Sequence, residues 1–249
     1  MTNVIVDVII LSYAKNVQLR KITEEAIVTL LNSEESIKFN VIVVESNIDC
    51  SPFEFENCNT IYPKKKFGYN KYMNIALDLT KNKYVCLCNN DLIFHKGWAS
   101  EILYQFQTDQ TLMSASPICS NVSNSKYPKI NSGNYYGYEI GKHVSGWCIF
   151  LDRRIINKIG KLDESFKFWY CDNDYANTLM KFNIKHVLIS TAIVDHLNSR
   201  TLISETQDSQ ARLMNQDFLY YQYKWKHQNF LKYISQEFRR FLKNRFWKG

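Results

Sequence analysis

The sequence predicts an α/β fold with an open, mostly parallel, doubly wound sheet, and three observations support this. Runs rich in Val and Ile, at Val4–Ser12, Phe39–Val44 and Tyr84–Cys88, are typical of strands covered on both faces. Apolar residues at helical spacing lie between these runs, at 17–31 and 70–79. Strands and helices alternate over the first 110 residues, which indicates right-handed βαβ units.

The remaining elements follow from the same patterns. Residues 118–143 are rich in Asn, Ser, Tyr and Gly, which predicts a long loop of the kind that is usually functional or mobile. Asp172 is expected to cap the helix that follows it. Further helices are predicted at 98–106, 153–159 and 172–182, and further strands at 60–62, 144–151, 185–189 and 192–194.

The composition indicates an ordinary globular protein. The chain has 249 residues, of which 45% are hydrophobic and 22% charged, so it can bury a sizeable core and is not disordered. Its apolar runs are far shorter than the roughly 20 residues of a membrane span, and no signal peptide is apparent. Seven cysteines without a zinc-type spacing predict reduced thiols and a cytoplasmic location.

The net charge of +7 is concentrated near the C-terminus. Residues 220–249 carry eight Lys or Arg against Glu237 alone, and their apolar residues share one side of a helical wheel from Phe230 onward. Three interpretations are open. The apolar face packs on the domain, or the helix lies on an anionic membrane surface, or it follows a nucleic-acid backbone.

Polar residues follow three of the predicted strands. In a doubly wound sheet the carboxyl ends of the strands share one crevice, so these clusters are expected to converge there. A carboxylate at that position can hold Mg²⁺ or Mn²⁺ together with phosphate oxygens and water, whereas the alternative is ordinary turn chemistry. The clusters are Ser12-Tyr13, Glu45-Ser46-Asn47 and Asn89-Asn90-Asp91.

A second group of candidate residues lies in the later half of the chain. Asp172 and Asp174 follow an aromatic stretch that includes Trp169 and Tyr170. A carboxylate among aromatic rings is partly desolvated, which raises its pKa and makes it a competent base, although capping of a helix explains it equally well. His196 follows a predicted strand and is either a ligand or a surface residue.

Taken in order, these motifs resemble the family 2 glycosyltransferases of the GT-A fold, especially the rhamnosyltransferase-like branch. The resemblance extends over roughly residues 4–201. Two departures are notable: Cys171 replaces the usual first acid of its box, and Asn89 is a neutral first member of the DXD-type metal motif. The matching segments are Val8–Tyr13, Val43–Asn47, Phe67–Ala76, Leu87–Asp91 followed by Trp98, Ser145–Arg154, Ile159–Phe166, Tyr170–Tyr175 and His196.

The resemblance implies a metal-dependent, inverting transfer of a hexose or pentose from a nucleotide-diphosphate sugar such as a UDP-sugar. Asp172 would be the base, with Asp174 as second candidate, and Asp91 with His196 would bind Mn²⁺ or Mg²⁺. Donor contacts would come from Ser12, Tyr13, Glu45, Asn47, Asn74, Asn89 and Asn90, and acceptor contacts from Gly146, Trp147, Trp169 and Tyr170.

It also implies a domain organisation and a set of partners. Residues 1–204 would form the GT-A domain, with a nucleotide-sugar half at 1–117 and an acceptor-side half at 118–204, followed by a basic helical tail at 205–249. The expected acceptor is a glycan or a lipid-linked saccharide. The alternative acceptor is a hydroxymethylated base in DNA, in the cytoplasm of a host if a phage encodes the protein.

Two other function classes remain as alternatives. A nucleotidyltransferase on a similar scaffold would release pyrophosphate, but Ser12-Tyr13-Ala14-Lys15 is a poor substitute for its glycine-rich, basic loop. A non-catalytic module would use residues 220–249 to bind polyanions without any need for Asp91 or Asp172.

Overall fold

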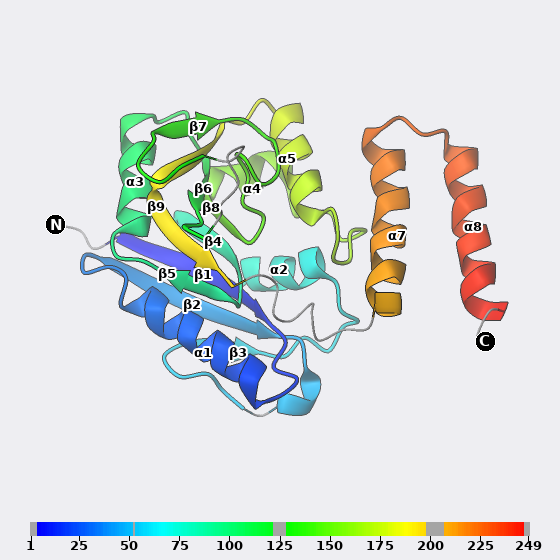
Figure 1. Ribbon diagram of the computed structural model, residues 1–249, viewed down its shortest axis with the longest axis horizontal. Coiled ribbons are helices and arrows are strands. Elements are labelled where there is room, and N and C mark those ends of the chain that lie inside the picture. Colours follow the sequence, from blue (N-terminus) through cyan, green and yellow to red (C-terminus); the bar gives the residue numbers. More distant parts are fainter. Residues whose placement is uncertain (1–3, 52, 122–127, 198–206, 247–249) are drawn as a thin grey trace.

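The computed structural model has a central mixed sheet with helices on both faces (Figure 1). It describes residues 4–51, 53–121, 128–197 and 207–246, with the side chains of 207–213 and 243–246 left aside. The strands are β1 (Val4–Ser12), β2 (Ile37–Glu45), β3 (Asn59–Ile61), β4 (Tyr84–Asn89), β5 (Leu92–Phe94), β6 (Ser114–Ile118), β7 (Asn134–Tyr136), β8 (Cys148–Asp152) and β9 (His186–His196). The helices are α1 (Val17–Leu31), the 3-10 turn η1 (Ile48–Cys50), α2 (Tyr69–Leu77), α3 (Trp98–Thr108), α4 (Arg154–Ile159), α5 (Cys171–Lys181), α7 (Gln207–Trp225) and α8 (Phe230–Phe246).

The sheet has the order β3-β2-β1-β4-β8-β6-β9-β5, with β7 added beside β9. The first four strands are parallel, and β8 then runs antiparallel to both β4 and β6. Strands β5 and β7 pair antiparallel with β9, while β6 and β9 are parallel. The sheet is therefore mixed, and its parallel half carries the strand ends where the first three polar clusters lie.

Alternation along β1 divides the core into two layers. Val6, Val8 and Ile10 point into the layer under α1 and α3, whereas Ile9 points into the layer under α2, α4 and α5. All four side chains are fully buried. This explains why β1 is continuously apolar, because both faces of the strand are covered by helices.

Several predicted elements differ in the structure. Tyr170, in the left-handed region at φ 61°, is the N-cap of α5, so Asp172 lies in the first turn and is not the cap that we predicted. The strands predicted at 185–189 and 192–194 are one continuous strand, β9, because Ser190 and Thr191 stay in the extended backbone. Of the segment 118–143, in which we predicted a long loop, residues 122–127 lie outside the described residues; the described part is mostly loop and turn but contains the end of β6 and the short strand β7.

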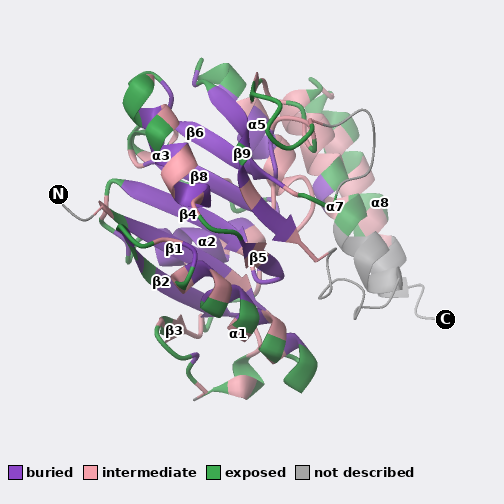
Figure 2. Ribbon diagram, turned by 60° about the vertical axis from the view of Figure 1, so that its left-hand side comes forward, coloured by how far each residue is buried: buried purple, intermediate pink, exposed green. Residues whose placement is uncertain are grey.

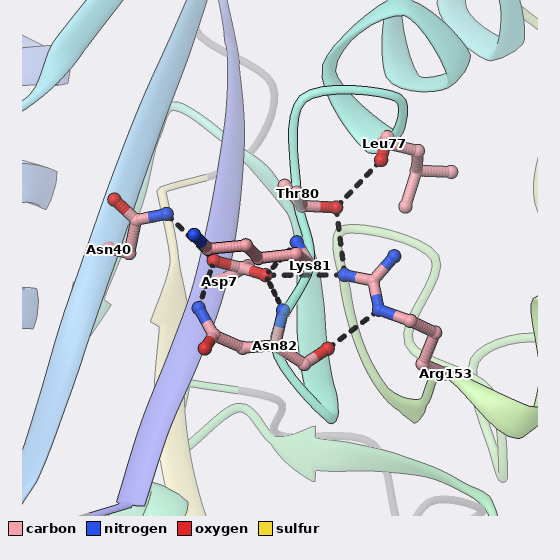
Figure 3. A network of polar contacts seen from close by, with 7 residues as sticks. All are labelled: Asp7, Asn40, Leu77, Thr80, Lys81, Asn82 and Arg153. Atoms are coloured by element: carbon pink, nitrogen blue, oxygen red, sulfur yellow. Dashed lines mark hydrogen bonds and ion pairs between the residues drawn. The ribbon is translucent and has the colours of Figure 1, made fainter.

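A buried network around Asp7 fixes the end of β1 that lies away from the polar clusters (Figure 3). Asp7 is fully buried and accepts hydrogen bonds from the backbone N–H groups of Lys81 and Asn82, at 3.0 and 2.7 Å. It also accepts one from the Asn40 amide at 2.7 Å and forms an ion pair with Arg153 at 3.2 Å. The network ties β1 to β2, to the turn before β4 and to the residue before α4.

The C-terminal segment forms two helices, α7 and α8, joined by a short turn (Figure 1). Helix α7 packs on the domain: Asp217, fully buried, accepts hydrogen bonds from the backbone of Lys167, Phe168 and Trp169 at 2.8–3.1 Å. None of the helices in the described part of the chain is long and apolar enough to cross a bilayer.

Candidate active site

A cavity of about 590 Å³ opens at the carboxyl ends of β1 and β4, which is the size of a small-molecule site. Ser12 and Tyr13 line it from the end of β1, and Asn89, Asn90 and Asp91 line it from the end of β4. Other residues that line the cavity come from the later half of the chain and from the segment that leads into α2. They include Gly146, Trp147, Trp169, Tyr170, Cys171, Asp172, Tyr175 and His196 from the later half, and Phe67, Tyr69 and Asn70 around the start of α2.

Asp91 and His196 meet in this cavity although they are far apart in sequence. The antiparallel pairing of β5 with β9 places Leu92 opposite His196, which brings the imidazole beside the residue that precedes Leu92. His196 Nε2 lies 3.2 Å from Asp91 Oδ1, and this buried nitrogen makes no hydrogen bond within the described part of the chain. The indole of Trp147 stacks on the imidazole with ring centroids 5.5 Å apart and fixes its plane.

The chemistry of this pair fits a divalent cation. A carboxylate oxygen and an imidazole nitrogen are both ligands for Mn²⁺, and Mg²⁺ or Mn²⁺ commonly binds to one or two protein groups plus phosphate oxygens and water. A buried imidazole nitrogen without a hydrogen bond, aimed at a carboxylate, is what a metal ligand presents in the absence of metal. Asn90 is less available because its side-chain amide donates to Thr23 at 2.9 Å.

Asp172 lines the same cavity from the first turn of α5. Burial raises the pKa of its carboxyl above the ordinary value of 3.8, against the opposing effect of a hydrogen bond from the Asn173 N–H at 2.8 Å. Among the described residues that line the cavity, Asp91 and Asp172 are the only carboxylates. The two predicted acids therefore face one shared cavity.

Gly146 makes this arrangement possible through a close backbone approach. A Cβ at position 146 would lie 2.6 Å from Asp172 Cβ and 2.8 Å from its Oδ2. These distances are shorter than non-bonded atoms tolerate, so a side chain at position 146 would displace the Asp172 carboxylate. Gly146 was predicted as an acceptor contact, and the structure adds a reason for glycine that the sequence does not reveal.

Four predicted site residues do not line the cavity. The Glu45 carboxylate accepts hydrogen bonds from the backbone N–H of Ala14 at 3.0 Å and of Asn47 at 2.7 Å, so it holds the two loops after β1 and β2 together. The Asn47 amide donates to the Ala14 carbonyl. The Asn74 side chain donates a hydrogen bond to the Leu162 carbonyl and accepts one from the Leu162 N–H.

Asp174 is the fourth of these residues. It forms an ion pair with Lys224 at 2.7 Å and accepts a hydrogen bond from the Trp225 indole at 2.7 Å. Burial raises its pKa, and the contacts with Lys224 and Trp225 oppose that effect. Asp174 thus anchors α7 to α5 and points away from the position that a base would occupy.

Sequence reasoning missed several features of the site. Tyr69 and Tyr175 line the cavity, and Asp217 supports its wall from α7. Asn70, a weaker candidate for the donor pocket, does line the cavity. The sequence offers no signal for Asp217, because it lies in a polar helix outside the resembling segments. It also missed a cluster of three buried thiols beneath the cavity, in which Cys86, Cys88 and Cys148 have sulfur atoms 3.4–3.9 Å apart.

Two solved structures are similar in fold to this chain. Over 78% of this chain and 44% of the other, the protein is similar to GalNAc-T7 in complex with UDP, GalNAc and Mn²⁺, with a TM-score of 0.60 and 9% identity. Over 90% of this chain and 64% of the other, it is similar to the mannosyltransferase PcManGT from Pyrobaculum calidifontis in complex with GDP-Man and Mn²⁺, with a TM-score of 0.58 and 14% identity.

The predicted GT-A fold is confirmed. At these identities the likeness concerns the fold, and the chain spans less than two thirds of the length of both proteins. No protein-family model and no curated protein sequence matches the chain. The assignment to family 2 and to its rhamnosyltransferase-like branch therefore stays a prediction.

Proposed function

We propose that the protein is a metal-dependent glycosyltransferase that moves a sugar from a nucleotide-diphosphate sugar to an acceptor hydroxyl, with inversion at the anomeric carbon. The observation that carries this proposal is the shared cavity, which is lined both by the Asp91–His196 pair and by the desolvated Asp172. A base and an anion-stabilising centre in one cavity are what a displacement at the anomeric carbon requires.

In this proposal the residues that line the cavity have separate roles. Asp91 and His196 would hold Mn²⁺ or Mg²⁺, which when bound neutralises the charge that develops on the leaving diphosphate. Ser12 and Tyr13, with Asn89, would contact the nucleoside and the diphosphate from the strand ends. The Asp172 carboxylate accepts the proton of the attacking hydroxyl, and its raised pKa suits it to that step near neutral pH.

The number of carboxylates in the cavity supports inversion over a double displacement. Retention through a covalent intermediate, as glycosidases achieve it, requires a nucleophilic carboxylate in addition to the acid–base group. Among the described cavity residues the only other carboxylate is Asp91, which contacts His196. We therefore propose a single displacement in which Asp172 acts as base only.

The aromatic wall favours a saccharide acceptor. Trp147, Trp169 and Tyr170 line the acceptor side, and aromatic rings pack well on the apolar faces of sugars. The buried indole N–H of Trp169 has no hydrogen-bond acceptor within the described residues, so a sugar oxygen would satisfy it. These features support a glycan or lipid-linked saccharide over a DNA base.

The test combines binding and turnover. A panel of nucleotide sugars with Mn²⁺ is screened by thermal shift, and the product is then sought by intact mass on glycan and on hydroxymethylated DNA acceptors. We expect one donor to stabilise the wild type, Asp91→Ala to lose that stabilisation, and Asp172→Asn to keep it while losing turnover. Full activity of both variants would contradict the site assignment, and a product on DNA alone would contradict the acceptor class.

A further inference from the structure

Helix α8 packs on α7 through its polar and aromatic side. Tyr233 stacks on Tyr223 with ring centroids 4.8 Å apart, and Tyr220 lies 6.3 Å from the same ring. Gln236, three residues along α8, accepts a hydrogen bond from Gln228 at 2.5 Å. Positions 233 and 236 lie on the same side of the helix, so this side faces α7.

Most apolar residues of α8 lie outside this side and are exposed. We define the apolar stripe as Phe230, Leu231, Ile234 and Phe238, whose exposed fractions are 56, 75, 46 and 61%. At the 3.6-residue period they fall within an arc of about 100°. Phe230, at the edge of the stripe, also contacts the Tyr223 ring of α7, with ring centroids 5.9 Å apart. Figure 2 shows α8 outside the main body of the protein, coloured as exposed and intermediate. A helix of a globular domain normally buries such a stripe, so this one indicates an interaction surface.

Positive charge borders the stripe. Lys232 and Arg239 lie next to each other on the helical wheel, on the arc between the Leu231 edge of the stripe and the side that faces α7. Residues 220–249 carry eight basic residues and one acid, which accounts for the whole net charge of the chain. Two of these bases have local acidic partners, since Lys224 pairs with Asp163 and Asp174 and Arg240 with Glu237.

An exposed apolar stripe bordered by Lys and Arg is the pattern of a helix that lies in a membrane interface. We propose that α8 binds an anionic lipid surface, with the stripe inserted at the boundary between headgroups and acyl chains and the basic residues among the headgroups. A nucleic acid would pair with the basic residues, but it would not cover the apolar side chains of Leu231 and Ile234. A second copy of the chain would cover the stripe but would bring like charges together.

The surface is physically linked to the acceptor side of the cavity. Helix α7, on which α8 packs, holds the backbone of 167–169 through Asp217, and Tyr221 of α7 stacks on Tyr170 at 5.0 Å. If the proposed glycosyl transfer is correct, a protein held on a bilayer by α8 receives its acceptor at that bilayer. The inference thus names a lipid-linked saccharide as the acceptor class, and this step rests on the proposed function.

The binding step is tested without any catalysis. The full chain is sedimented with vesicles of phosphatidylcholine alone and with vesicles of equal parts phosphatidylcholine and phosphatidylglycerol. We expect binding to the anionic vesicles only, weakening as salt is added. Each Lys or Arg near such a surface contributes about fivefold in affinity, so Lys232→Gln with Arg239→Gln should weaken binding about 25-fold. Leu231→Ser with Phe238→Ser should abolish it.

The matched control is Val28→Ser with Leu79→Ser, which removes two hydrophobic side chains of similar exposure, 56 and 55%, from other surfaces. It should bind like the wild type. Equal loss in the control, equal binding to neutral vesicles, or binding to duplex DNA without binding to vesicles would overturn the proposal. A monomer–dimer equilibrium that Leu231→Ser with Phe238→Ser removes would assign the stripe to a second copy instead. Because the assay needs no donor sugar, its outcome is independent of the thermal-shift test of the proposed function.

Discussion

Replacing Gly146 with alanine tests whether the position of the Asp172 carboxylate matters for turnover. The new Cβ would lie 2.6 Å from Asp172 Cβ and 2.8 Å from Oδ2. An ordinary contact begins at 3.4 Å, so the two Cβ atoms must separate by about 0.8 Å. A misplacement of about 1 Å costs on the order of 100-fold in rate, so we expect Gly146→Ala to lower kcat by about 10- to 100-fold.

The assay follows release of the nucleoside diphosphate from the donor found in the thermal-shift panel, with Mn²⁺ and the acceptor present. Donor-induced stabilisation should remain, because the nearest atoms that the added Cβ would meet all belong to Asp172 and none to Asp91 or His196. Gly68→Ala is the matched control: Gly68 has an extended backbone at φ −172°, and an added Cβ would meet its neighbours at an ordinary 3.6 Å. That variant should keep near-normal kcat.

The reasoning is refuted if Gly146→Ala turns over within twofold of the wild type while Asp172→Asn is inactive. In that case the carboxylate would be essential, but its position would tolerate the shift, and the close approach at Gly146 would have no catalytic meaning. A loss in Gly68→Ala equal to that in Gly146→Ala would instead show that any methyl group added near the cavity is harmful.

Five further outcomes are expected. Asp172→Asn should lose about 10²–10⁴ in kcat, and in the wild type kcat/KM should fall on the acid side with a midpoint above 3.8, measured as a pH–rate profile. The same variant should have a higher Tm at neutral pH, because the folded state raises the pKa of this carboxyl and so disfavours its charged form, a cost that wild type sheds as pH falls through the raised pKa. Asp91→Ala should abolish the Mn²⁺ dependence of donor stabilisation in the thermal-shift assay, and a chelator should do the same to wild type. An undiminished rise in Tm on donor addition in both cases would contradict the proposed metal site. Asp7→Ala should lower the free energy of unfolding by about 3–5 kcal/mol in urea, because it leaves Arg153 without its buried partner, and a loss under 1 kcal/mol would contradict this. Lys224→Met should cost about 3 kcal/mol in the same assay by leaving the Asp174 charge uncompensated, and wild-type stability would show that Asp174 does not depend on it.

The parallel half of the sheet could be predicted because its signals are local. The strands β1, β2 and β4 are covered on both faces, so each is a run of Val, Ile and Leu that differs sharply from its flanks. The strand β6 was missed because its sequence, Ser114–Ile118, contains two serines and a proline, and only the pairing with β8 and β9 makes it a strand. A three-residue strand such as β5 carries no periodicity at all.

The candidate site shows the same division. Residues directly after strands, such as Ser12 and Asp91, are in the cavity because topology alone brings strand ends together. Glu45 also follows a strand, but its carboxylate turns to the backbone N–H groups of Ala14 and Asn47. A carboxylate that binds a ligand and one that binds a neighbouring loop have the same sequence signal, so the sequence cannot separate the two.

The contact between Asp217 and the backbone of 167–169 has a consequence for biosynthesis. These three N–H groups precede Tyr170–Asp172, and their acceptor is about 50 residues further along the chain. A ribosome must therefore complete α7 before this segment is fixed, so nascent chains without α7 should lack the mature wall of the cavity. For the same reason, a truncation after residue 204, where the sequence alone would end the domain, would remove the acceptor on which this segment depends.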